Sequence, residues 1–168
     1  MLRTDKATSK VRIVFDGSAC SGENSSSLND NLEVVDNFMP PNFETLMMFR
    51  LHAIALTSDI ENAFLQIELK EFDRDALRFL WFDYVNAEVP NLIQMRIKRV
   101  PFGLRCSPAN LGATIRHHVN LFTETHSEAV RVLNRLYADD MSCSVDSSQQ
   151  AFHLYKDCKD IMKRGDLT

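Results

Sequence analysis

The sequence lacks several features that would each indicate a class of protein. No apolar run approaches the length of a membrane-spanning helix, and the polar start at residues 1–6 is no secretory signal. The four cysteines form no Cys-x-x-Cys pair and have no histidine at zinc-finger spacing. They are therefore interpreted as reduced, mostly packed thiols of an intracellular protein, whose compartment (cytoplasmic particle or nucleus) is left open. There is no internal repeat and no convincing linker.

The chain has no excess of positive charge overall, but one segment of it does. The net charge of -4 gives the chain no general attraction to nucleic acid or to anionic membranes. Between Asn91 and Thr123, however, there is no Asp or Glu, and the segment holds a set of basic residues: Arg96, Lys98, Arg99, Arg105 and Arg116. A solvated basic face is one interpretation. The other is a phosphate-binding patch, because the segment brackets a loop-to-helix junction.

The composition is that of a globular protein of one domain. The chain has 168 residues, of which 45% are apolar and 25% are charged, so it can bury a core. The patterns of apolar residues predict a mixture of strands and helices. The residues expected in the core are Ile54, Leu56, Leu80, Ile97, Leu111, Ile115, Leu133 and Leu136.

The expected elements alternate along the chain. Strands are predicted over residues 11–15, 53–60, 77–82 and 92–100, and helices over 42–52, 107–122 and 148–164. Asn42, Ser107 and Ser147 are the expected N-caps of those helices, with Pro108 at the first helical position. The Met and Phe residues of the first helix are expected in the core. The loop over 20–31 is rich in Ser and Asn, which favours a mobile linker over a functional loop.

Two adjacent carboxylates, Asp139 and Asp140, lie between two apolar stretches. The pattern predicts two strands, over about 130–137 and 141–145, joined by a tight turn with the acids at its tip. A third acid, Asp59, comes at the C-terminal end of a strand that we expect to be buried. Acidic turns on solvated hairpins are common, so this stretch alone does not indicate a catalytic site.

Carboxylates on separate strands are what metal-dependent phosphoryl transfer requires. Transfer from a nucleoside triphosphate uses two divalent ions about 4 Å apart, which stabilise the attacking and leaving oxygens. Mg²⁺ is commonly held by one or two carboxylates together with substrate phosphates. Asp59 and the Asp139–Asp140 pair meet this requirement if their strands are neighbours, which sequence spacing does not establish.

Three ordered segments resemble the palm motifs A, B and C of reverse transcriptases. They are Ser58-Asp59-Ile60-Glu61-Asn62-Ala63-Phe64, then Pro101-Phe102-Gly103-Leu104-Arg105-Cys106-Ser107-Pro108, then Tyr137-Ala138-Asp139-Asp140. The style is similar to that of LTR retrotransposons, with the BEL/Pao group closest and the Gypsy group next. The resemblance covers the chain from about Lys10 onward.

The resemblance implies a set of catalytic and metal-binding residues. Asp59 and Asp139 would bind two Mg²⁺ ions, for which Mn²⁺ is a possible substitute. Asp140 would be the third acid, and the backbone carbonyl of Ile60 would join the metal site. The implied activity is that of an RNA-directed DNA polymerase, a nucleotidyltransferase that adds a deoxynucleotide to a primer 3′-hydroxyl.

The resemblance also implies the residues that contact the substrates. Phe64 matches the bulky residue that excludes a ribose 2′-hydroxyl, although a core Phe after a strand is the alternative. Arg12 would grip the incoming triphosphate, for which a planar guanidinium is suited, and Asp16 completes that short motif. Phe102 and Gly103 would line the floor beneath the nucleotide, and Tyr137 would lie beside the primer end.

The fold implied is α+β: a reverse-transcriptase-type palm with a small antiparallel sheet and helices on one face. Partial fingers would occupy about residues 1–52 and the palm about 53–168, with the thumb and RNase H absent. Retroviral enzymes have Gln where this chain has Phe102, and Cys106 replaces a small or polar residue. Expected partners are the RNA or DNA template-primer, the dNTP, and the rest of a polyprotein (thumb, RNase H, protease and integrase), with no membrane.

Two other interpretations stay open. One is a catalytically inactive retroelement remnant that binds nucleic acid weakly through the basic segment, in a manner that salt weakens steeply. The other is another palm-type nucleotidyltransferase, such as an RNA-dependent RNA polymerase. Phe64 argues against the latter, because an enzyme that makes RNA needs room for the 2′-hydroxyl.

Overall fold

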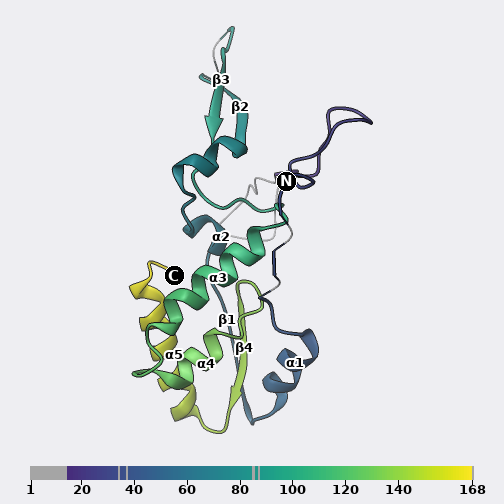
Figure 1. The fold of residues 1–168 in the computed structure, drawn as a ribbon. Helices are drawn as coiled ribbons and strands as arrows, with labels where there is room; N and C mark the ends of the chain where they lie inside the picture. The colour runs from purple at the N-terminus through teal and green to yellow at the C-terminus, as the bar shows by residue number, and fades with distance from the viewer. Residues whose placement is uncertain (1–14, 34, 37, 85, 87, 168) are drawn as a thin grey trace. The chain divides into compact units, whose positions relative to one another are not determined.

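A computed structural model describes residues 15–33, 35–36, 38–84, 86 and 88–167 (Figure 1). The chain divides into two compact units, each made of two segments. Unit 1 comprises residues 1–34 and 68–107, and unit 2 comprises residues 35–67 and 108–168. Across the described ranges, no helix is both long and apolar enough to cross a membrane.

Unit 2 contains an antiparallel pair of strands, β1 (Ile54–Asp59) and β4 (Asp140–Val145). Their register runs from Ile54 opposite Val145 to Asp59 opposite Asp140. Met141, Cys143 and Val145 alternate into the core, as their spacing predicts. β1 is a strand as expected, but it is not buried: Ile54 and Leu56 are half-buried and its other residues are exposed. β1 pairs with β4 alone among the described residues, so less of its surface is covered than in the buried strand that we expected.

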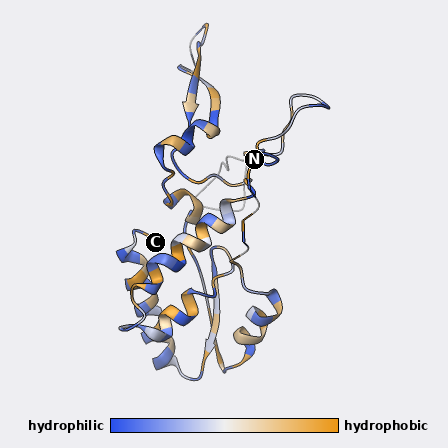
Figure 2. Cartoon of the chain, in the orientation of Figure 1, coloured by the Kyte–Doolittle hydropathy of each residue, from blue (hydrophilic) through white to orange (hydrophobic). Residues whose placement is uncertain are grey.

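Helices pack on this pair of strands within unit 2. α4 (Ser127–Leu133) and α5 (Ser148–Arg164) contact β4 on one side, and α1 (Asn42–Arg50) contacts it on the other (Figure 1). The apolar residues of α3 (Ser107–Asn120) and α4 are visible as orange stretches in Figure 2. The core prediction is confirmed for Leu111, Ile115, Leu133 and Leu136, which are buried.

Of the other residues expected in the core, one is exposed and three are only half-buried. Leu80 is 66% exposed, because it lies on a hairpin that pairs with no further strand among the described residues. Ile97, like Ile54 and Leu56, is half-buried. In a sheet of only two strands, the alternation of apolar residues shows which side chains share a face. It does not show whether another element covers that face and buries them.

The approach to the acidic turn is a helix and not the expected strand. Val130 and Leu133, which we assigned to a strand over about 130–137, lie on α4, and strand pairing begins only at Tyr137. Val130, Leu133 and Leu136 recur at intervals of three, which is a helical period, and all three are buried. This spacing is the signal that the strand prediction overlooked.

Helix starts were predicted with mixed success. Ser147 is the N-cap of α5, where its side chain accepts from the Gln150 amide in a capping box. Ser107 is instead the first residue of α3, and its hydroxyl donates to the Pro101 carbonyl at 2.7 Å. Asn42 is likewise the first residue of α1, after Pro41 as N-cap.

The first helix also contradicts its predicted burial. No residue of α1 is buried, and Phe43 is 73% exposed. The expected core role of its Met and Phe residues is therefore wrong for this structure. α1 contacts the face of β4 opposite to that covered by α4 and α5, and Ser144 on that face donates its hydroxyl to the Met48 carbonyl at 2.6 Å. The expectation of helices on one face of the sheet is therefore wrong for this pair of strands.

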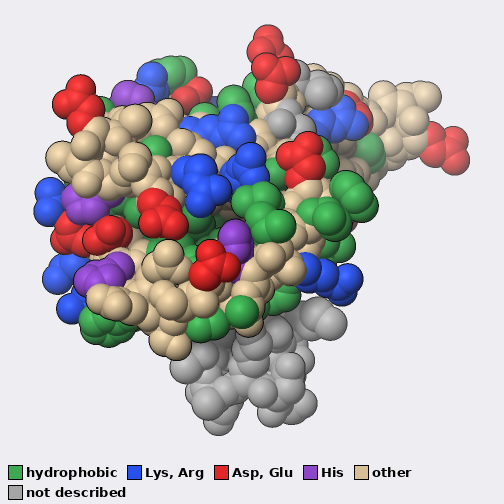
Figure 3. Space-filling view, turned by 90° about the horizontal axis from the view of Figure 1, so that it is seen from below, with side chains coloured by type: hydrophobic (Ala, Val, Ile, Leu, Met, Phe, Trp, Pro, Cys, Tyr) green, Lys and Arg blue, Asp and Glu red, His purple; other side chains and the backbone are tan. Residues whose placement is uncertain are grey.

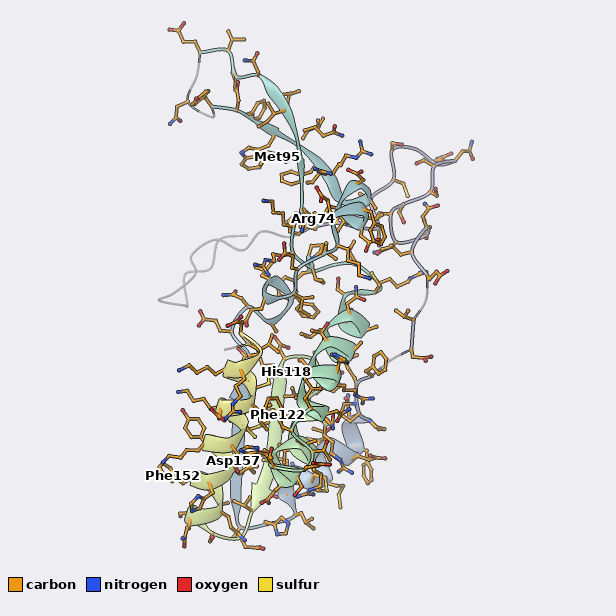
Figure 4. All side chains as sticks on the ribbon, turned by 60° about the vertical axis from the view of Figure 1, so that its left-hand side comes forward. Arg74, Met95, His118, Phe122, Phe152 and Asp157 are labelled. Carbon is orange, nitrogen blue, oxygen red and sulfur yellow. The ribbon has the colours of Figure 1, made fainter. Side chains whose placement is uncertain are left out.

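Unit 1 contains a hairpin of β2 (Arg78–Phe82) and β3 (Leu92–Arg96), preceded by the 3₁₀ helix η1 (Glu71–Leu77). Both strands are confirmed, although β3 ends before the expected residue 100. The hairpin is mostly exposed, and it carries an edge-to-face pair of Phe79 and Trp81 with ring centroids 6.4 Å apart. Met95, labelled in Figure 4, faces Phe79 across the ladder.

Candidate functional site

The acidic turn is a two-residue turn closed by backbone hydrogen bonds. The Tyr137 amide donates to the Asp140 carbonyl at 2.9 Å, and the Asp140 amide donates to the Tyr137 carbonyl at 3.0 Å. Ala138, at the tip, has a φ of 56°, a left-handed conformation that such tight turns require. Asp139 is half-buried and Asp140 is exposed. The predicted tight turn is present, with Ala138 and Asp139 at its tip, whereas Asp140 is the first residue of β4.

The backbones of the three acids lie at the same end of the β1–β4 pair. Asp59 lies directly opposite Asp140 in the strand register, and the Ile60 amide donates to the Asp139 carbonyl at 3.1 Å. These contacts join two segments that are about 80 residues apart in the chain. The condition that sequence spacing left open, that the two strands are neighbours, is therefore met in the structure.

Carboxylates of this kind suit a hard cation such as Mg²⁺, but they do not form a complete cage. Among the residues that the structure describes, no group of three His, Cys, Asp or Glu side chains is positioned to hold a metal. Mg²⁺ is usually bound by one or two carboxylates, with substrate phosphates and water completing its octahedron. Asp59, Asp139 and Asp140 supply carboxylate oxygens, the type of ligand that this mode of binding uses.

The segment after β1 turns sharply into the short helix α2 (Ala63–Gln66). Asn62 adopts a left-handed φ of 50°, which Asn tolerates better than most residues. The Ile60 carbonyl accepts from the Ala63 amide at 3.3 Å, and one lone pair of that oxygen is left for another partner. Phe64 is 7% exposed on α2. Its burial agrees with the core alternative, and its role as a sugar gate stays a prediction.

Gly103, in unit 1, lies where no other residue fits. Its φ is 90°, and a Cβ at this position would collide with the Phe15 carbonyl oxygen. Asn29 fixes the same segment, since its side-chain amide donates to the Gly103 carbonyl at 3.0 Å and accepts from the Arg105 amide at 2.9 Å. The neighbouring Phe102 is half-buried.

Asn29 is the structural residue that sequence reasoning missed. It belongs to the loop over 20–31, which its composition assigned to a mobile linker. In the structure this loop holds the Gly103 segment through two side-chain hydrogen bonds. No pattern in the sequence distinguishes Asn29 from the other Asn and Ser residues around it.

The proposed triphosphate-binding motif is only partly visible. Arg12 lies outside the described residues. Asp16 is exposed, and its carboxylate accepts from the Ser18 amide at 3.1 Å in the turn that the Asp16-Gly17-Ser18 sequence predicts. Tyr137, the expected neighbour of the primer end, is 37% exposed beside the acids.

The residues of the basic segment belong to both units. Arg96 is paired with Asp75 at 3.1 Å, whereas Lys98 and Arg105 are exposed in unit 1. Arg116 belongs to unit 2, where it donates to the Phe38 carbonyl at 2.8 Å and its guanidinium lies 5.1 Å from the Phe38 ring. Basic, acidic and apolar side chains are interspersed on the face shown in Figure 3.

Comparisons with known proteins give a match to a family model and a match in fold. Residues 8–168 match the family model for "Reverse transcriptase (RNA-dependent DNA polymerase)". Among solved structures, a foamy viral protease-reverse transcriptase in complex with double-stranded DNA matches with a TM-score of 0.58 and 18% identity. That match covers 83% of this chain and 21% of the other, so the chain spans about a fifth of that protein. The curated proteins contain no match.

The likeness to the foamy viral structure shows the fold alone, and the family model shows the family. The matched range includes all three acids, the Gly103 segment and Phe64. An α+β arrangement of helices and small antiparallel sheets agrees with it. The chain therefore belongs to the reverse transcriptase family, that of RNA-directed DNA polymerases.

Proposed function

We propose that this chain carries the polymerase centre of a reverse transcriptase, which adds a deoxynucleotide to a primer 3′-hydroxyl on an RNA or DNA template. The observation that carries the proposal is the register of β1 and β4, which puts Asp59 opposite Asp140 and beside the Asp139 backbone. Bound at this end of the sheet, two Mg²⁺ ions would neutralise the charge that develops on the attacking and leaving oxygens.

The acids have separate roles in this proposal. Asp59 and Asp139 are the metal ligands, Asp140 is the third acid, and the Ile60 carbonyl joins them. The strand pairing places the backbones of Asp59 and Asp140 opposite each other, and binding of the metal would draw the carboxylates together. Mn²⁺ would take the same oxygen ligands.

Substrate contacts follow from the family motifs. Arg12 would bind the triphosphate, Phe102 and Gly103 would support the nucleotide, and Tyr137 would lie by the primer end. The left-handed φ of Gly103 supports its part of this assignment, because the close approach of the Phe15 backbone admits no side chain. Phe64 would exclude the ribose 2′-hydroxyl.

We further propose that the chain comes from an LTR retrotransposon of the BEL/Pao group, on the basis of the residues in its three motifs. In that setting residues 1–52 would form partial fingers and 53–168 the palm. The protein would act as part of a polyprotein with thumb, RNase H, protease and integrase segments. Its nucleic-acid partner would be a template-primer duplex, which agrees with the duplex bound by the foamy viral protein.

Primer extension by the full chain and its acid variants tests the proposal. Asp139→Asn removes a charged metal ligand while keeping size, and we expect extension to fall by about 100-fold or more. Asp59→Asn should do the same. Asp146→Asn is the matched control, because Asp146 is exposed just beyond the opposite end of β4 and pairs with His52. Extension that survives Asp139→Asn unchanged would contradict the assignment.

A further inference from the structure

A pocket of about 340 Å³ lies within unit 2, between α5, α4 and the ends of the two strands that carry the acids. This size falls in the range of sites that hold small organic molecules, about 300–1,000 Å³. The pocket is lined by Ser58, Asp59, Ile60, Leu133, Leu136, Met141, Tyr155, Cys158, Lys159, Met162, Lys163 and Leu167.

The inner part of the pocket is apolar and adaptable. Leu133, Met141 and Met162 are all less than 9% exposed, and Met side chains reshape around a ligand at little cost. Cys158 adds a thiol to this wall. Burial raises the pKa of Cys158 to about 12, so the thiol is neutral at physiological pH and contributes no charge. The interior is therefore suited to a ring or a short hydrocarbon chain.

The mouth of the pocket carries two ammonium groups. Lys159 and Lys163 lie one helical turn apart on α5, and both line the pocket. The Lys159 ammonium donates to the Tyr155 hydroxyl at 3.1 Å, which holds it near the rim. Asp59 and Ser58 form part of the opposite wall. Two lysines and one carboxylate thus line the pocket, so the α5 side of the mouth favours a negative charge.

We propose that this pocket binds a small amphipathic anion, with an aromatic or aliphatic body among Leu133, Met141 and Met162 and a carboxylate or sulfonate against Lys159 and Lys163. Charge complementarity and volume select this ligand class. The ligand class proposed for this pocket differs from the nucleotide substrate of the proposed polymerase centre. Asp59, however, belongs both to that centre and to the wall of the pocket. An occupant would therefore contact the end of the strand that positions a catalytic acid.

Titration with 8-anilinonaphthalene-1-sulfonate, an aryl sulfonate of this class, tests the proposal through its fluorescence. We expect saturable binding of one dye per chain. Lys163→Glu should weaken the affinity by about tenfold, as expected when a charge-assisted contact is lost, and Lys163→Arg should restore it. Lys156→Glu is the matched control, because it makes the same charge change on α5 at a residue that does not line the pocket.

Met162→Trp tests the apolar part by filling it, and we expect this variant to lose dye binding. Near-ultraviolet circular dichroism of each variant separates loss of the pocket from loss of the fold, since loosely packed states also bind this dye. Equal affinity in wild type, Lys163→Glu and Lys156→Glu, or several dyes bound per chain, would overturn the proposal. The assay needs no polymerase activity, so its outcome is independent of the proposed function.

Discussion

At the scale of single residues, three backbone positions with positive φ lie within the three motif segments. They are Ala138, Asn62 and Gly103; Asp166, after α5, is a further described residue with positive φ and lies outside the motifs. For Ala138 and Asn62 the left-handed conformation follows from tight turns beside the acids. For Gly103 it is combined with the close approach of the Phe15 carbonyl. These positions tolerate substitution poorly, for reasons of conformation as well as chemistry.

Gly103→Ala is predicted to destabilise the protein. A Cβ at a φ of 90° is disfavoured by about 1–2 kcal/mol, and the collision with the Phe15 carbonyl adds to this. Urea unfolding should show a loss of about 2 kcal/mol or more in the free energy of unfolding. Gly22→Ala should leave it nearly unchanged, because no atom lies within 4 Å of a Cβ at that position. Equal stability of both variants would mean that the Gly103 segment is not held as described.

Phe64→Val separates the two interpretations of the ring after β1. If Phe64 is the sugar gate, the variant gains the use of NTPs in primer extension; if it is only a core residue, the variant loses stability and keeps its preference for dNTPs. We expect the first result, measured as the ratio of NTP to dNTP extension. Leu65→Val, a change at the adjacent and 43% exposed residue, should leave the ratio unaltered.

At the scale of elements, sequence periodicity predicted those parts of the chain that local rules govern. The N-cap at Ser147, the helix over 148–164 and both strands of the β2–β3 hairpin follow from spacing over a few residues. The strand assigned before the acids failed, because an apolar stretch near Val130 satisfies both periods and tertiary packing selected the helix. Burial of α1 and β1 also failed, since it depends on what else covers them.

The turn of the β2–β3 hairpin contains a carboxyl with a shifted pKa. The Asn91 side chain donates to Asp83 at 3.0 Å, and this bond, with that from the Tyr84 amide, lowers the pKa of Asp83 below its ordinary value of 3.8. Stabilisation of the turn is thus present above the ordinary pKa and fades as the pH falls through the lowered one.

Carboxyl NMR titration checks this prediction. Asn91→Ala should raise the pKa of Asp83 toward 3.8, because the first of its causes is removed. Asn86→Ala, at an exposed residue of the same turn, is the control and should leave the pKa where it is. An unchanged pKa in Asn91→Ala would show that the side-chain bond does not form in solution.

At the scale of the whole molecule, the catalytic proposal depends on pairing across about 80 residues of sequence. No local sequence pattern indicates that these two segments pair. The proximity of Asp59 to the Asp139–Asp140 pair could therefore be predicted from the sequence only through the resemblance to family motifs. The clamp by Asn29 was missed for the same reason, since its partners lie more than 70 residues away. The motif residues can thus be identified from the sequence, but the contacts between distant segments can be seen only in the structure.

Primer extension by the 168-residue chain, with Mg²⁺ and with dNTPs and NTPs in parallel, tests the central claim most directly. The account predicts extension with dNTPs, little with NTPs, and loss of both on chelation of the metal. Asp139→Asn in the same reactions should abolish the signal. Extension by NTPs as readily as by dNTPs, or extension that persists without a divalent ion, would contradict a metal-dependent DNA polymerase.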